Sequence, residues 1–104
     1  MQYQYVPLLR QEERFRKDAK RSAKRLSEEA TSYFSRLAKE LPEQTLVTAR
    51  DALRREDTES IDDVLSNLAN HLVREDGTPH YLVRSCYAAL KQYVAAKKRQ
   101  SLTN

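Results

Sequence analysis

The sequence predicts an all-α protein, a bundle of three to four helices in which one long N-terminal helix projects from an αα-hairpin core. Apolar and small residues recur at intervals of three or four through most of the 104 residues, which is the period of an amphipathic helix. The chain contains one Gly and three Pro, too few for the frequent turns of a β-rich architecture. Its length suits a single domain.

The long helix is predicted over about residues 8–41, a stretch that contains neither Gly nor Pro. Pro7 suits a first helical position, and Pro42 is expected to end the helix. Such a helix would be about 52 Å long, whereas a compact domain of this length has a diameter of roughly 33 Å. Large apolar residues are concentrated in the second half, at 26–41. We therefore expect that half to pack on the bundle and the first half to project.

Three shorter helices are expected to follow the long one, and the polar residues between them supply the boundaries. Ser60 resembles the N-cap of a capping box, Gly77 a C-terminal stop, and Pro79 the first residue of the last helix. The short connection around Gly77 predicts that the last two helices are neighbours in an αα-hairpin. The predicted ranges are about 43–55, 60–75 and 79–99.

These helices form one domain over residues 1–104, with a basic N-terminal arm at about 1–25, a helical core at about 26–99 and a frayed tail at 100–104. No stretch is apolar enough for a transmembrane span, and the N-terminus does not resemble a secretory signal. Cys86 is the only cysteine, so no internal disulfide can form. We expect a protein of the reducing cytoplasm.

Charge is partitioned strongly along the chain. Residues 10–25 contain eight basic and three acidic residues, residues 42–76 contain four and nine, and residues 77–104 contain five and none. An isolated soluble helix usually mixes the two signs through pairs at i and i+4, so an excess of one sign is informative. A basic first segment and an acidic middle segment indicate a binding protein with two different surfaces.

The basic arm is the leading candidate site. Five of its residues are spaced 4, 3, 4 and 3 apart, from Arg10 to Lys24, and so line one helical stripe without acids. Such a rod can follow the phosphate backbone of DNA or RNA, because each Lys or Arg contact releases condensed counterions. The predicted nucleic-acid-binding residues are Arg10, Arg14, Lys17, Lys20, Arg21, Lys24 and Arg25. A solvated face that contacts nothing would produce the same stripe.

A protein–protein adaptor or inhibitor is the alternative function. Its basic arm would dock an acidic protein, and an acidic patch would dock a basic one. The same acids could instead provide favourable charge near a helix N-terminus. The predicted partner-binding residues of this acidic patch are Glu56, Asp57, Glu59, Asp62 and Asp63.

Self-association is a third hypothesis. Small and apolar residues at Ala19, Ala23 and Leu26 recur at heptad spacing on the arm, where they would let two helices approach closely as a homodimer seam. A purely structural oligomer of this kind would use the seam and leave the charge pattern unexplained.

Catalytic and metal-binding motifs are not found in the sequence. His71 and His80 alone do not complete a zinc site, and both are expected at the surface. Cys86 lies in an apolar row and is expected in the core. Nucleophile loops, phosphate-binding glycine loops and EF-hand spacing are all missing. We predict a non-enzymatic protein with no cofactor and no metal.

Overall fold

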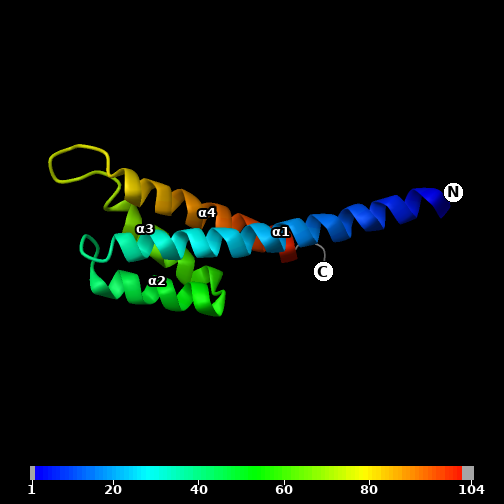
Figure 1. Ribbon diagram of the computed structural model, residues 1–104, viewed down its shortest axis with the longest axis horizontal. Helices are drawn as coiled ribbons and strands as arrows, with labels where there is room; N and C mark the ends of the chain where they lie inside the picture. Colours follow the sequence, from blue (N-terminus) through cyan, green and yellow to red (C-terminus); the bar gives the residue numbers. More distant parts are fainter. Residues whose placement is uncertain (1, 102–104) are drawn as a thin grey trace.

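The structure is a computed structural model that describes residues 2–101, with side chains for Gln11 and residues 13–101. It contains four helices over this range, and successive helices run in opposite directions (Figure 1). The predicted all-α fold with a long N-terminal helix is confirmed. The helices are α1 (Gln2–Arg36), α2 (Glu43–Arg55), α3 (Thr58–Ala69) and α4 (Tyr81–Ser101).

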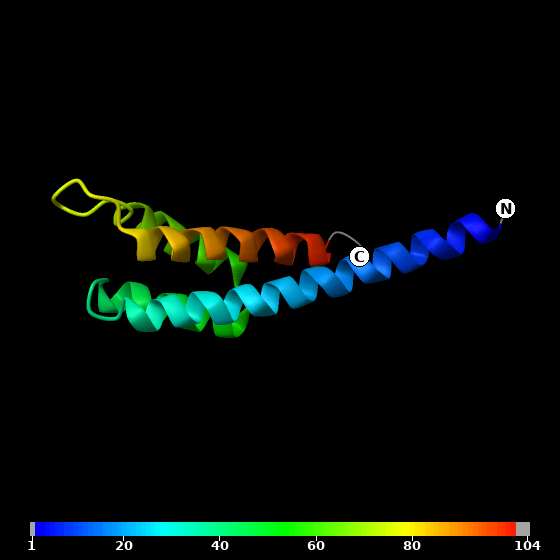
Figure 2. The ribbon, with the colours of Figure 1, turned by 45° about the horizontal axis from the view of Figure 1, so that its top comes forward.

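Helix α1 makes the molecule elongated. Its N-terminal part extends beyond the other three helices, and the overall extents are 63 × 26 × 19 Å (Figure 2). The radius of gyration is 16.8 Å, compared with about 13 Å for a compact chain of this length. The predicted projection of one end of this helix is therefore confirmed.

Both predicted boundaries of α1 were wrong. The helix begins at Gln2 and includes Pro7, so this proline is not a first helical residue. It ends at Arg36 rather than Leu41, because the chain enters a turn in which the Glu40 amide donates to the Leu37 carbonyl at 2.9 Å. The backbone before Pro42 is also biased away from helical angles.

The connection between α2 and α3 is a tight turn stabilised by capping. α2 has the predicted bounds, Glu43–Arg55, and ends at Glu56, whose φ of 55° is left-handed. The Asp57 amide donates across this turn to the Ala52 carbonyl at 2.9 Å. Asp57, and not Ser60, is then the N-cap of α3, since its carboxylate accepts from the Ser60 amide at 3.3 Å.

The predicted extent of α3 to residue 75 was also wrong. Its last turn tightens through a bond from the His71 amide to the Leu68 carbonyl at 2.9 Å, and the helix ends at Ala69. The Leu72 carbonyl then accepts from the His80 amide at 3.0 Å and from Arg84 Nε at 3.1 Å. These bonds draw the chain toward α4 instead of continuing α3.

Residues 70–80 form a small loop. The sequence had predicted a shorter connection around Gly77, with helix on both sides of it. An isolated antiparallel bridge joins Val73 to Pro79, and Gly77 has a φ of 87° inside this loop. Gly77 is thus not a helix stop, and Pro79 is not the first residue of α4. The cap of α4 is His80, whose Nδ1 accepts from the Val83 amide at 3.5 Å. α3 and α4 remain antiparallel neighbours.

The core contains large side chains from all four helices, listed here with their exposed fractions: Phe34 0%, Leu53 5%, Ile61 0%, Leu68 0%, Leu90 0% and Tyr93 1%. Cys86 is buried among them as predicted, and burial raises the pKa of its thiol to about 12. The most extensive contact between two helices is that of α1 with α4. It positions the last turns of α4 against the middle of α1.

Candidate nucleic-acid interface

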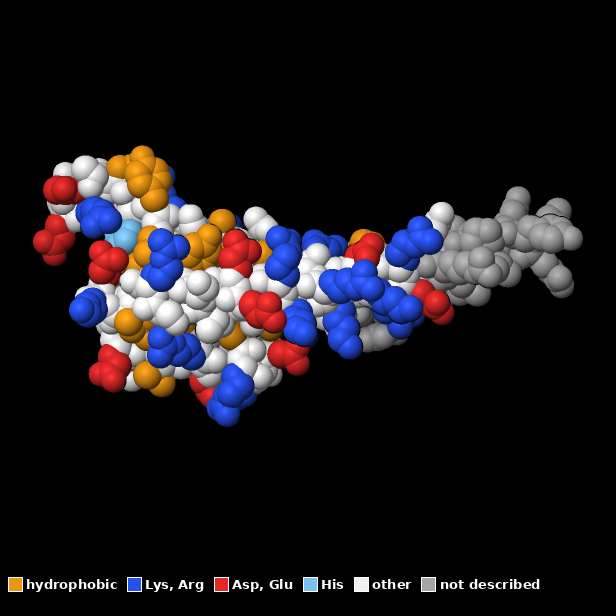
Figure 3. Space-filling view, in the orientation of Figure 1, with side chains coloured by type: hydrophobic (Ala, Val, Ile, Leu, Met, Phe, Trp, Pro, Cys, Tyr) orange, Lys and Arg blue, Asp and Glu red, His pale blue; other side chains and the backbone are white. Residues whose placement is uncertain are grey.

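The basic residues of α1 lie where the helix leaves the bundle. Blue side chains gather over this part of α1 with few acidic ones among them (Figure 3). The exposed members are Arg14, Lys17, Lys20, Arg21, Lys24 and Arg25. Arg10 lies in the helical backbone of α1, and its side chain is outside the described residues. The other six predicted residues therefore share one exposed segment of helix.

The end of α4 brings a further basic residue to the same place. The last turns of α4 lie beside the middle of α1 in both ribbon views (Figures 1 and 2), and Lys97 belongs to this part of α4. A surface depression of about 380 Å³ joins the two helices. It is lined by Arg16, Lys17, Lys20, Lys97, Gln100 and Ser101. Two segments about 80 residues apart in sequence thus form one positive surface, which we call the two-helix basic surface (Arg14–Arg25 of α1 and Lys97 of α4).

Few of these cations are neutralised. Lys97 pairs with Glu56 at 2.8 Å, and this ammonium lowers the pKa of the Glu56 carboxyl. Lys20 adds a weaker attraction to the same carboxylate. Among the described side chains, no other ion pair within 4.0 Å involves the two-helix basic surface. Its remaining positive charge faces solvent.

A second pocket adjoins this surface, between α1, the end of α2 and α4. It has a volume of about 400 Å³ and is lined in part by Ala23, Leu53 and Tyr93. The Tyr93 hydroxyl and Gln100 Oε1 are buried there without a hydrogen-bond partner among the described residues. Burial, and then the nearby Glu56 carboxylate, raise the pKa of Tyr93, so its hydroxyl stays protonated at neutral pH.

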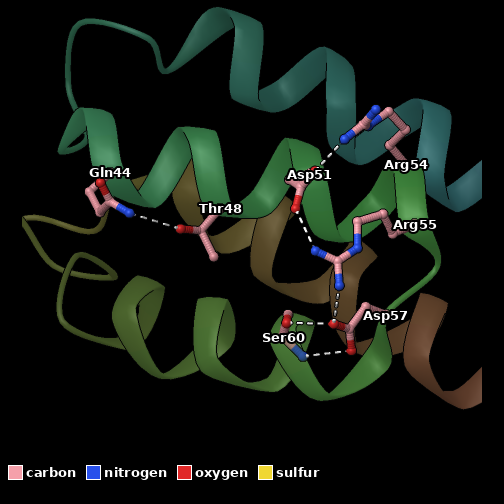
Figure 4. A network of polar contacts seen from close by, with 7 residues as sticks. All are labelled: Gln44, Thr48, Asp51, Arg54, Arg55, Asp57 and Ser60. Carbon is pink, nitrogen blue, oxygen red and sulfur yellow. Dashed lines mark hydrogen bonds and ion pairs between the residues drawn. The ribbon is translucent and has the colours of Figure 1, made fainter.

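The predicted acidic patch separates into two parts. Asp57 accepts from the Ser60 hydroxyl at 2.8 Å, which lowers the pKa of its carboxyl, and it lies 3.7 Å from Arg55 (Figure 4). Together with the Lys97–Glu56 pair, these contacts give the first two acids structural roles. The other three, Glu59, Asp62 and Asp63, are exposed on α3.

Arg55 ties the ends of two helices together. Its guanidinium lies 3.0 Å from Asp51 on α2 as well as 3.7 Å from Asp57 at the start of α3 (Figure 4). Arg54 also donates to Asp51, and this bond is the main reason that the pKa of the Asp51 carboxyl is lowered. The basic residues of α2 are in this way largely paired with their acidic neighbours.

The proposed dimer seam is covered within the single chain. Ala19, Ala23 and Leu26 are 3%, 4% and 4% exposed. Ala23 shares the second pocket with Tyr93 of α4, and Leu26 shares another depression with Ala89 of α4. A second copy could reach this face only by displacing α4. The burial of Ala19 and Ala23 also shortens the part of α1 that projects.

The two histidines differ from the sequence prediction of surface positions. His80 is 8% exposed and caps α4, with its Nε2 3.5 Å from Glu40, which also lies 3.8 Å from Arg74. His71 is half-buried and, together with Glu40 and His80, lines a surface depression. No group of three His, Cys, Asp or Glu among the described residues is placed to bind a metal ion.

Comparison with known proteins does not assign the chain to a family. No family model matches it, and neither a curated protein nor a solved structure is significantly similar to it. No helix in the described part of the chain is both long enough and apolar enough to cross a membrane.

Sequence reasoning missed the contribution of α4 to the basic surface. The excess of basic residues at 77–104 was visible, but not which part of α1 it would face. It also missed Tyr93 and Gln100 as pocket residues. Tyr93 lies in an apolar row, so the pattern indicates only that it is buried.

Proposed function

We propose that this chain is a small non-enzymatic nucleic-acid-binding protein of the cytoplasm, which contacts the phosphate backbone through the two-helix basic surface. The observation that carries the proposal is the convergence of α1 and the end of α4, which concentrates cations with one close acidic partner among the described side chains. Each such cation that contacts a phosphate releases a condensed counterion.

The shape of the molecule supports the same proposal. Residues 14–25 of α1 lie at the side of the bundle where this helix extends beyond the others, so a long polyanion can run along it without contacting the acidic α3. Phosphate contacts of this kind position a protein without reading base sequence. The expected binding is strong at low salt, weak at high salt and largely independent of sequence.

The test is binding to mixed-sequence DNA and RNA over a salt series. The parent protein should show a steep inverse dependence of affinity on salt. Replacing Arg14, Lys17 and Arg21 together by Gln should lower the slope of log K against log salt by up to about 0.9 per lost contact. The loss of affinity should be similar on all sequences.

The matched control replaces the exposed acids Glu59, Asp62 and Asp63 by Gln. These lie on α3, and their carboxylates make no hydrogen bond or ion pair among the described residues, unlike those of Glu56 and Asp57. Their loss should leave nucleic-acid binding unchanged or slightly stronger. If the parent protein fails to bind at low salt, the proposal is wrong, and the adaptor function leads instead.

A further inference from the structure

One part of the two-helix basic surface is concave, namely the depression of about 380 Å³ between α1 and the end of α4. No acidic residue lines this depression, and four of its six lining residues are cationic: Arg16, Lys17, Lys20 and Lys97. Arg16 was not among the predicted binding residues. The structure therefore divides the cations of α1 into a group that lines the depression and an outer group, which includes Arg14 and Arg21.

The cations reach the depression from two helices. Those of α1 are exposed, whereas the Lys97 side chain of α4 is 19% exposed and is the most confined of the four. Its ammonium is held by Glu56, whose side chain is 66% exposed and is not part of the lining. Gln100 adds an amide N–H₂ group, which can donate to an anion. An anion in the depression would thus find positive charge or donors on both helices.

The number of cations around one concave site indicates which phosphate fits. An internal phosphate of a nucleic-acid strand carries one negative charge and has a sugar on each side. A terminal phosphate carries about 1.5 to 2 negative charges at neutral pH and has three strong acceptor oxygens. Arg can donate to two of these oxygens at once, and Lys binds phosphate as a point charge. The four cations therefore suit a terminal phosphate better than an internal one.

We propose that the depression between α1 and α4 binds the terminal phosphate of a nucleic-acid strand, so that the protein prefers phosphorylated ends to hydroxyl ends. The inference rests on the proposed function and adds the part of the nucleic acid that is preferred. Arg16 and Lys97 would contact the terminal group from opposite helices. The adjoining backbone would continue along α1, which extends past the end of α4 (Figure 2).

The experiment measures fluorescence anisotropy of two short mixed-sequence DNA strands at low salt. One strand ends in a 5′-phosphate, and the other ends in a 5′-hydroxyl and is one nucleotide longer, so both contain the same number of phosphate groups. Contacts with the backbone alone would hold them about equally. We expect the phosphorylated strand to bind about three- to tenfold more tightly, the size of a few exposed ion pairs. A 3′-phosphorylated strand is measured against the same longer strand, and a preference for either phosphorylated end supports the proposal.

Two double variants remove the same charge from different places. Arg16→Gln with Lys97→Gln should abolish the preference for the phosphorylated end. Arg14→Gln with Arg21→Gln is the matched control, because neither cation lines the depression, and it should weaken both strands by the same factor. Arg16→Gln alone leaves the Lys97–Glu56 pair intact and should reduce the preference without changing the urea midpoint.

The outcomes separate the two proposals. Equal affinity of the parent for phosphorylated and hydroxyl-ended strands would overturn the terminal-phosphate site and leave the backbone-binding function standing. A preference that survives the loss of Arg16 and Lys97, or that disappears with Arg14 and Arg21, would also overturn it, since the depression would then not recognise the end. Failure of every strand to bind at low salt would overturn both.

Discussion

The basic segment of α1 and the acidic connection between α2 and α3 are both densely charged, but they use their charges differently. At the end of α2 and in the connection, Asp51, Glu56 and Asp57 pair with basic side chains, and Asp57 also caps a helix. On α1, residues 14–25 leave nearly all their positive charge toward solvent. Charged side chains that are paired within the chain contribute to its stability, whereas exposed unpaired ones are available to bind a partner. The predictions below test this division.

The largest effect is expected for Leu26→Asp, which places a charge at the contact of α1 with α4. The Leu26 side chain is 4% exposed, so the substitution removes its packing and buries an unpaired carboxylate. We expect a loss of more than about 3 kcal/mol in the free energy of unfolding. Urea denaturation should show this loss at every protein concentration.

The same variant decides whether the Ala19–Leu26 face is internal or a seam between copies. If two chains met there, the stability of the parent would rise with protein concentration, and Leu26→Asp would yield a folded monomer. A Leu26→Asp monomer with the same urea midpoint as the parent monomer would contradict the α1–α4 packing described above.

Acid should weaken the fold through the carboxylates at and beside the α2–α3 connection. The pKa values of Asp51, Glu56 and Asp57 are lowered by their hydrogen bonds to Arg54, Lys97 and Ser60. Lowered carboxyl pKa values mean that the unfolded chain binds more protons, so stability is present above the unfolded values and falls as pH drops through the folded ones. The urea midpoint should therefore be lower at about pH 3 than at about pH 6.

Substitutions at Asp57 test whether this acidic residue stabilises the fold through its helix cap or through its charge. Asp57→Ala removes both the acceptor that caps α3 and the contact with Arg55. Asp57→Asn keeps a side-chain oxygen, and Asn is as good an N-cap as Asp. We expect Ala to destabilise and Asn to restore most of the stability, with a weaker dependence on acid. Equal destabilisation by both would indicate that the charge, and not the cap, matters.

The smallest effect on stability is expected for the basic segment of α1. Gln replaces Arg and Lys with little change in helix propensity, and exposed substitutions usually change stability by less than about 0.5 kcal/mol. The variant with Arg14, Lys17 and Arg21 changed to Gln should match the parent in urea denaturation. A clear loss of stability would show that these cations make intramolecular contacts.

The helical elements were predictable where local signals were unambiguous. α2 follows from Pro42 and the polar residues after Arg55, and its bounds were predicted correctly. The loop at 70–80 was not predicted correctly. Gly77 and Pro79 suit a helix boundary as well as they suit the small bridged loop that forms. Leu72 and Val73 continued the apolar pattern, but the Leu72 carbonyl bonds to the start of α4 instead.

The candidate site was predictable only in part. The basic stripe from Arg14 to Lys24 follows from spacing alone, and its exposure agrees with that pattern. That the end of α4 lies beside it depends on the lengths and directions of three intervening elements, which no local pattern specifies. Gln100 belongs to α4, although its polar neighbours suggested a frayed tail; residues 102–104 lie outside the described residues.

The most direct test of the two-helix basic surface is the salt dependence of nucleic-acid binding after Lys97 is changed to Gln. Glu56→Gln is the matched control, because it breaks the same ion pair and keeps the cation. If the end of α4 shares the phosphate-binding surface, Lys97→Gln should lower the slope of log K against log salt by up to about 0.9, in addition to the change caused by the α1 variant, and Glu56→Gln should not lower it. An unchanged slope would contradict the account, because the convergence of the two helices would then have no part in binding.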